Sequence, residues 1–171
     1  FDKAKTTIQK QLKKKPKELT LYASLGNVFE KAGDAKEAEA NYSKSVELLT
    51  DDSYMILSLG NSYRALGKND YALKVYEKAV SFSKKYKQMF AFQMAEIYLL
   101  NNDKPKMIDC YLEYVSTTSV NNYNNASYLE SVFQRYLAPE DYEILETQLY
   151  NRVQENPDNT SFIDLLIWSF I

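Results

Sequence analysis

The sequence predicts an all-α protein built from repeated helix hairpins, and three observations indicate this fold class. Residues 25–48 recur in similar form as residues 59–82, a shift of 34 positions. Within each copy the apolar residues are spaced by three or four, which is the period of a helix that buries one face. Only 4 glycines and 4 prolines occur in 171 residues, so few residues would interrupt a helix.

Each copy contains two helical runs that are separated by a glycine. In the first copy the runs lie on either side of Gly33, where a helix commonly ends in a left-handed residue and the chain reverses. Asp34 and Asn69 follow the turns and are predicted to cap the second helices, and Asn102 takes the place of the glycine in a third copy. The pairs in the two clear copies are Leu25 and Leu59, Gly26 and Gly60, Phe29 and Tyr63, Gly33 and Gly67, Ala38 and Ala72, Tyr42 and Tyr76, and Ser45 and Ala79.

These residues resemble the tetratricopeptide repeat, a 34-residue helix–turn–helix unit. Ser45 and Thr50 depart from its pattern, in which a small alanine and a closing proline stand. The resemblance implies a right-handed α-solenoid of stacked hairpins, the TPR superhelix, with about ten helices. It is strong in residues 19–86 and degenerate after residue 120. The expected organisation is one domain over 1–171, with the second helix of a partial repeat at 1–16, repeats at 19–52, 53–87, 88–120 and 122–157, and the first helix of a partial repeat at 159–171.

The chain is predicted to begin and end in the middle of a repeat and therefore to be a fragment of a longer protein. Residues 162–171 read FIDLLIWSFI and are almost wholly apolar. An uncapped end of a solenoid exposes core surface, so we expect self-association through this C-terminal helix. Pro139 is expected to open the second helix of the fourth repeat.

Composition argues against several classes of function. The 21 basic and 23 acidic residues leave a net charge of −2, which does not favour nucleic-acid binding, although seven lysines lie within residues 1–18. No apolar stretch is long enough to predict membrane insertion. The sequence has no histidine, no CxxC motif and no glycine-rich phosphate loop, so we expect no enzyme, no catalytic residue, no metal and no cofactor. The single thiol, Cys110, is expected to be buried and inert.

The resemblance also implies a concave groove lined by the first helices. Asn27 and Asn61 occupy equivalent positions there, and an asparagine amide offers both a donor and an acceptor to a peptide backbone. Two other interpretations remain open: the asparagines are ordinary exposed polar residues, and the groove aromatics pack against a later turn of the chain. The predicted peptide-binding residues are Asn27, Glu30, Tyr54, Leu57, Asn61, Arg64, Met89, Phe92 and Glu96.

The sequence therefore predicts a non-catalytic scaffold that binds a protein, as a peptide or a partner helix. The alternatives are a structural solenoid that organises a larger assembly, such as one in a cell envelope, and the sensor module of a multidomain regulator. Loss of Asn27 and Asn61 tests the first, and a charge near Phe162 or Trp168 tests the second. Abundant Lys, Asn, Tyr and Ile predict an AT-rich bacterial genome, and both cytoplasm and periplasm remain open.

Overall fold

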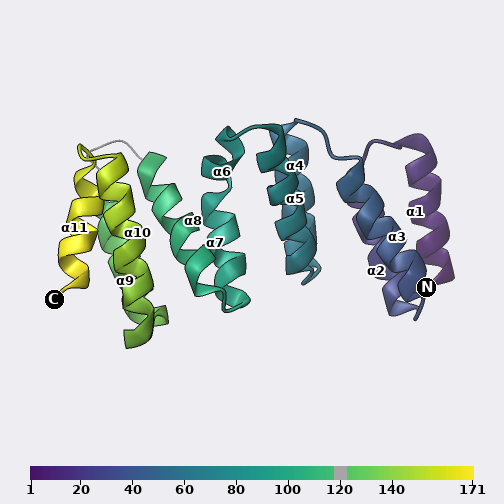
Figure 1. Ribbon diagram of the computed structural model, residues 1–171. Helices are drawn as coiled ribbons and strands as arrows, with labels where there is room; N and C mark the ends of the chain where they lie inside the picture. Colours follow the sequence, from purple (N-terminus) through teal and green to yellow (C-terminus); the bar gives the residue numbers. More distant parts are fainter. Residues whose placement is uncertain (118–122) are drawn as a thin grey trace. The chain divides into compact units, whose positions relative to one another are not determined.

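A computed structural model describes residues 1–117 and 123–171 of the chain. These residues form eleven α-helices and one short 3₁₀ helix, with no strand among them (Figure 1). The predicted all-α class of helix hairpins is thereby confirmed. The helices are α1 (Asp2–Lys14), α2 (Leu19–Lys31), α3 (Ala35–Glu47), α4 (Ser53–Ala65), α5 (Asn69–Phe82), α6 (Lys85–Met89), α7 (Ala91–Leu100), α8 (Lys104–Thr117), α9 (Tyr123–Tyr136), η1 (Pro139–Asp141), α10 (Tyr142–Glu155) and α11 (Thr160–Ser169).

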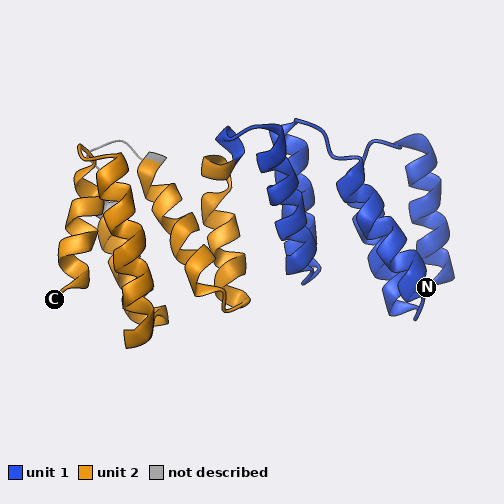
Figure 2. Cartoon of the chain, viewed as in Figure 1, with its two compact units in different colours: residues 1–86 blue, residues 87–171 orange. Residues whose placement is uncertain are grey.

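The chain forms two compact units, residues 1–86 and residues 87–171 (Figure 2). In unit 1, α2 pairs with α3 and α4 pairs with α5, while α2 lies beside α4 and α3 beside α5. In unit 2, α7 pairs with α8, and α10 packs against both α8 and α11. The division falls one residue before the predicted border between the repeats 53–87 and 88–120. The single domain over 1–171 stays a prediction, and the repeat borders at 120 and 122 lie outside the described residues.

Three hairpin turns share one backbone geometry. Gly33, Gly67 and Asn102 have φ values of 86°, 70° and 56°, so each adopts the left-handed conformation that the sequence predicted there. Asparagine tolerates this conformation better than most residues that carry a Cβ. At each turn the next residue donates its backbone N–H to the carbonyl five positions earlier, from Asp34 to Phe29, from Lys68 to Tyr63 and from Asp103 to Tyr98.

One of the two predicted caps is confirmed and the other is wrong. Asp34 caps α3, since its carboxylate accepts the backbone N–H of Glu37 at 3.1 Å. Asn69 is itself the first residue of α5. The N-cap position belongs to Lys68, which makes no side-chain capping bond and pairs instead with Glu30 on α2.

The first helix of the third repeat is interrupted, which raises the helix count from the expected ten or so to eleven. Phe90 separates α6 from α7 with a non-helical backbone (φ −110°, ψ 10°), and its side chain is only 2% exposed. The core therefore holds the residue at which the helix breaks. Pro139 likewise does not open α10 directly, because it begins the 3₁₀ helix that precedes α10.

The glycines of the repeated Leu-Gly pair allow close contact between the helices of each hairpin. A Cβ placed on Gly26 would lie 2.5 Å from the ring of Tyr42, and one on Gly60 would lie 2.5 Å from the ring of Tyr76. Both tyrosine rings are buried, so they have little room to move aside. These two positions therefore need glycine for packing, and the turn positions need a left-handed residue for backbone conformation.

Ser45, which departs from the family pattern, has a partner in the neighbouring hairpin. Its hydroxyl lies 2.5 Å from the hydroxyl of Tyr63, which also donates to the backbone carbonyl of Tyr42 at 3.0 Å. Ser45 and Tyr63 are both fully buried. The first copy has Phe29 at the position that Tyr63 occupies in the second copy. The second copy therefore has a phenolic hydroxyl that the first lacks, and Ser45 is the residue that contacts it.

The Ser45–Tyr63 contact predicts a measurable coupling energy. We expect Ser45→Ala to lower the free energy of unfolding by about 1 kcal/mol, because a buried hydroxyl loses one of its hydrogen bonds. The same substitution in a Tyr63→Phe background should cost less, since the hydroxyl that Ser45 serves is then absent. A double-mutant cycle by urea unfolding measures the difference; additive single effects would contradict the coupling.

Candidate functional site

Six predicted groove residues lie in unit 1, on the neighbouring helices α2 and α4. Asn27 is half-buried and Asn61 is exposed. Tyr54 is 81% exposed and Leu57 is 38% exposed, so α4 presents apolar surface close to Asn61 in the chain. The first helices thus present an amide from each repeat together with apolar side chains.

Glu30 also links the two repeats of unit 1. The phenol of Tyr42 donates to one of its carboxylate oxygens at 2.8 Å, and the ammonium of Lys68 pairs with the other oxygen. These hydrogen bonds, from Lys68 first and then from Tyr42, hold the pKa of Glu30 below its usual value. Burial and the same carboxylate raise the pKa of Tyr42. Glu30 therefore contributes to packing between repeats, and its contact with a ligand stays a prediction.

The other predicted groove residues, Met89, Phe92 and Glu96, lie in unit 2. Met89 is the last residue of α6 and is 51% exposed, whereas Phe92 and Glu96 are half-buried on α7. A pocket of about 430 Å³ is lined by Gln88, Met89, Phe92, Gln93 and Tyr114. The ring of Phe92 lies 5.5 Å from that of Tyr114, 6.1 Å from Tyr111 and 6.3 Å from Tyr128, centroid to centroid.

The nine predicted residues thus form two groups, one in each unit. In unit 2 the structure places Met89 and Phe92 in the wall of one pocket, and Tyr114 completes that wall from α8. Tyr114 was not among the predicted residues, because it lies on a second helix and the family groove is attributed to first helices. These ring contacts join Phe92 to side chains of its own unit. Packing of the groove aromatics against a later turn of the chain stays an alternative.

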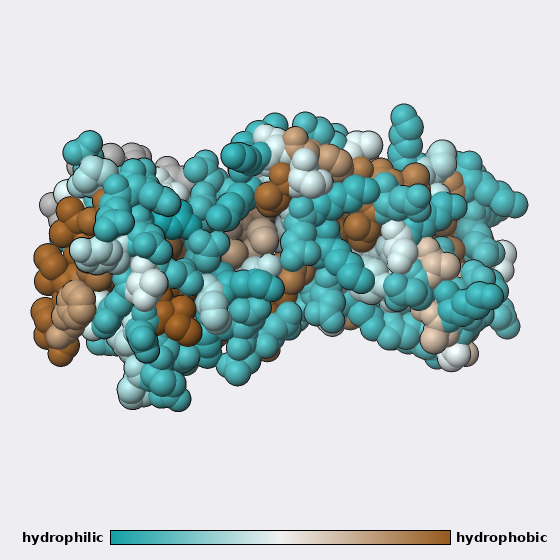
Figure 3. Space-filling model, viewed as in Figure 1, coloured by the Kyte–Doolittle hydropathy of each residue, from teal (hydrophilic) through white to brown (hydrophobic). Residues whose placement is uncertain are grey.

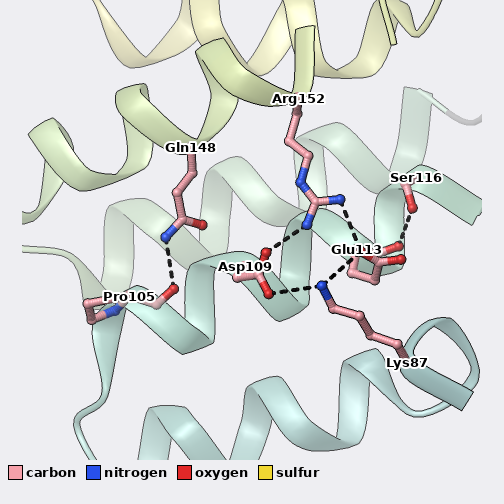
Figure 4. A network of polar contacts seen from close by, with 7 residues as sticks. All are labelled: Lys87, Pro105, Asp109, Glu113, Ser116, Gln148 and Arg152. Atoms are coloured by element: carbon pink, nitrogen blue, oxygen red, sulfur yellow. Dashed lines mark hydrogen bonds and ion pairs between the residues drawn. The ribbon is translucent and has the colours of Figure 1, made fainter. Parts of the chain in front are cut away.

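Unit 2 also contains a charged network that the sequence analysis missed (Figure 4). Arg152 on α10 donates to Asp109 at 2.7 Å and to Glu113 at 3.0 Å, both on α8. Lys87 lies 3.3 Å from Asp109 and 3.5 Å from Glu113. Next to them, Gln148 donates to the backbone carbonyl of Pro105 at 3.0 Å. Asp109 and Glu113 are four residues apart on one helix face, but nothing in the sequence indicates partners about 40 residues away.

The network lies at a polar pocket of about 460 Å³, lined by Lys87, Asp109, Glu113, Gln148, Asn151, Arg152 and Glu155. Burial disfavours the charge of Arg152, but its hydrogen bonds to Glu113 and Asp109 outweigh that effect and raise its pKa above the usual value. The two cations and the two acids of the network balance one another. Its evident role is to hold α10 against α8, and it offers no uncompensated charge to a ligand.

The thiol of Cys110, the single cysteine of the chain, is buried. Burial, helped by the neighbouring Asp109, raises the pKa of the Cys110 thiol to about 12, so the thiol is protonated at neutral pH and a poor nucleophile. Among residues 1–117 and 123–171 no cluster of three or more His, Cys, Asp or Glu could hold a metal ion. In the same residues no helix is both long and apolar enough to span a membrane.

Residues 19–48 and 54–86 match the family model of the tetratricopeptide repeat. These two segments are tetratricopeptide repeats, and they coincide with the hairpins α2–α3 and α4–α5 (with α6 beginning at the end of the second segment). The match confirms the resemblance in the part of the chain where the sequence carries it most strongly. Repeats of this family support a protein-interaction scaffold in general terms.

The chain is also similar to a curated protein and to solved structures, MamA among them. It is 23% identical over 108 residues to anaphase-promoting complex subunit 3 of Schizosaccharomyces pombe. The matched segment spans 63% of this chain and 16% of that protein. A crystal structure of MamA aligns with 99% of this chain and 86% of its own, at 15% identity and a TM-score of 0.44. The likeness to MamA is too weak to support conclusions about function. The bacterial origin of the chain stays a prediction.

Proposed function

We propose that the chain is a non-catalytic scaffold whose first-helix faces bind an extended peptide or a partner helix. The observation that carries the proposal is the placement of Asn27 and Asn61 on neighbouring helices of unit 1, one repeat apart. A side-chain amide in each repeat can accept a backbone N–H and donate to a backbone carbonyl, whatever the sequence of the ligand. Regularly spaced amides therefore suit a ligand with a regularly spaced backbone.

Apolar side chains beside these amides support a ligand that has hydrophobic residues. Tyr54 and Leu57 on α4 are both exposed. In unit 2 a separate pocket of about 430 Å³ places Met89 and Phe92 where one apolar side chain could enter. Exposed aromatic and Met side chains are common anchors at protein interfaces. Each unit thus provides apolar surface on its own.

The test is selection of binders from a random peptide library on the 171-residue chain, followed by affinity measurement with variants. We expect the double substitution Asn27→Ala and Asn61→Ala to lower the affinity for the selected peptides roughly tenfold. The reason is that each amide would contribute the modest net free energy of a hydrogen bond to the ligand. The melting temperature should stay nearly unchanged, because both side chains lie at least partly in solvent.

Asn41→Ala is the matched control, since Asn41 lies on the second helix α3 and donates to the carbonyl of Glu37 within that helix. It should leave peptide affinity unchanged. Selected peptides that bind the double variant as tightly as the parent chain would exclude recognition by these asparagines.

The second candidate function is a structural element of a larger assembly. The matched relative supports it, since its name describes a subunit of a complex. Under this alternative the double asparagine variant has no effect. The sequence suggested a charged substitution near Phe162 or Trp168 as the test of this alternative. Phe162 is not a suitable position, because its side chain is fully buried. Ile167 and Phe170, at 56% and 69% exposed, are the suitable positions on or beside α11.

A further inference from the structure

A second apolar pocket lies at one edge of unit 1, away from Asn27 and Asn61. It forms where the connection between α1 and α2 and the connection between α3 and α4 lie at the same edge (Figure 1). Its volume is about 440 Å³, and a smaller pocket of about 130 Å³ shares four of its residues. The larger pocket is lined by Pro16, Lys17, Leu19, Leu48, Thr50, Asp52 and Met55.

The pocket has an apolar wall that is open to solvent. Leu48, which follows the last residue of α3, is 42% exposed, while Leu19 at the start of α2 is 3% exposed. Met55 on α4 is half-buried. Hydrophobic residues reach the surface along this edge of unit 1, among hydrophilic ones (Figure 3). A cavity with such a wall can accept an apolar side chain of a partner, which would then be largely removed from water.

The surroundings of the pocket favour negative charge. Lys17 lines it, and Lys13, Lys14 and Lys15 come directly before Pro16 in the chain. These residues are part of a run of seven lysines within residues 1–18. Their positive potential extends over roughly a Debye length in physiological salt. An acidic partner is therefore attracted to this edge.

The two acidic residues at the pocket already have partners in the chain. Asp52 caps α4, where it accepts the backbone N–H groups of Tyr54 at 2.9 Å and Met55 at 3.0 Å. Glu18 accepts the hydroxyl of Thr20 at 2.9 Å. The N-cap residue of α2 is Glu18 itself, so a carboxylate of the chain already lies at the positive end of this helix dipole. The attraction for an acidic partner therefore comes from the lysines.

We propose that this edge of unit 1 binds an acidic segment of a protein partner that carries one apolar side chain. The apolar side chain occupies the pocket between Leu19, Leu48 and Met55. A neighbouring carboxylate pairs with Lys17, and the lysines before Pro16 attract the rest of the segment. Asn27 and Asn61 do not line this pocket, but Tyr54 of the proposed peptide-binding surface lines the smaller pocket beside it. The asparagine variants therefore distinguish the two sites.

The experiment uses fluorescence anisotropy with a labelled twelve-residue peptide of glutamate and serine that has one central leucine. A second peptide carries serine in place of that leucine. We expect the leucine peptide to bind the 171-residue chain roughly tenfold or more tightly than the serine peptide, because it buries one leucine side chain. Binding should weaken as salt is raised from about 50 to about 300 mM, since the charges are exposed.

Three variants locate the binding surface. Lys17→Glu and Leu48→Ser should each weaken the leucine peptide roughly fivefold or more, the first through charge and the second through loss of the apolar wall. Lys36→Glu is the matched control, because it makes the same change in charge at an exposed position on α3; it should change affinity less than about twofold. In NMR spectra the amides of Thr20 and Met55 should shift on addition of the leucine peptide.

Several results would overturn the proposal. Equal affinity of the leucine and serine peptides would show that the pocket takes no apolar side chain. An equal loss in Lys36→Glu and Lys17→Glu would reduce the effect to overall charge. Binding to phosphatidylserine vesicles without binding to the leucine peptide would assign the lysines to a lipid surface instead. Peptide binding that is lost in the Asn27→Ala, Asn61→Ala variant would place the ligand in the other site.

Discussion

Replacing Tyr76 with alanine is expected to lower the free energy of unfolding by about 3–5 kcal/mol, the largest effect of a single substitution that we predict for unit 1. The Tyr76 side chain is fully buried on α5, and its ring fills the space that Gly60 leaves on α4. Removal of the ring leaves a cavity between two helices whose close approach depends on that contact. Urea unfolding followed by far-ultraviolet circular dichroism measures the loss.

Tyr54→Ala is the matched control, since it removes the same side chain from a position that is 81% exposed. It should change the free energy of unfolding by less than about 0.5 kcal/mol. A loss of similar size in both variants would mean that Tyr76 is not packed as described. Because Tyr54 is also a proposed ligand contact, an unchanged stability makes this variant usable in binding measurements.

Replacing Arg152 with alanine is expected to destabilise unit 2 by about 3 kcal/mol, in the lower part of the range for breaking a buried ion pair. The side chains of Arg152 and Glu113 are only 15% and 11% exposed. Without the guanidinium, the poorly hydrated carboxylate of Glu113 loses its nearer ion-pair partner, and Lys87 remains at 3.5 Å. Trp168 is the single tryptophan of the chain and lies in α11, so its fluorescence follows the unfolding of this unit.

Two further variants separate the network from a simple effect of charge. Lys87→Ala should cost less than about 1 kcal/mol, because the Lys87 side chain is 42% exposed and water replaces much of its contact. The double variant Arg152→Met with Glu113→Leu should recover most of the stability lost in Arg152→Ala, since no uncompensated buried charge remains. A double variant as unstable as Arg152→Ala would point to the shape of the arginine side chain as the stabilising factor.

The sequence predicted the features that repeat and missed those that do not. Gly33, Gly67 and Asn102 share a place in the repeat, and all three adopt the left-handed conformation expected of that place. The failure at Asn69 is informative, because the residue type was right for a cap but the helix begins one position earlier than assumed. A shift of one residue decides whether a side chain precedes a helix or belongs to its first turn.

The polar contacts between repeats could not be predicted in the same way. Ser45 and Tyr63 are 18 residues apart, and Arg152 lies 39 residues from Glu113. Neither contact recurs at the repeat period, so alignment of the copies gives no sign of it. The residues of the candidate site were predictable from the sequence only in part. The repeat placed Asn27 and Asn61 on equivalent helices. It gave no sign that Tyr114 completes a pocket with Phe92, or that Lys17 lines a pocket with Leu48.

The contact between Ser45 and Tyr63 also bears on how such a chain can be engineered or can evolve by duplication. Each half of this contact belongs to a different hairpin, and the Tyr63 phenol has its second hydrogen-bond partner only when Ser45 is present. A second hairpin transplanted behind a neighbour with alanine at that place would bring a hydroxyl that lacks one of its partners. Exchange of modules should therefore be designed from the middle of one hairpin to the middle of the next, so that matched halves travel together.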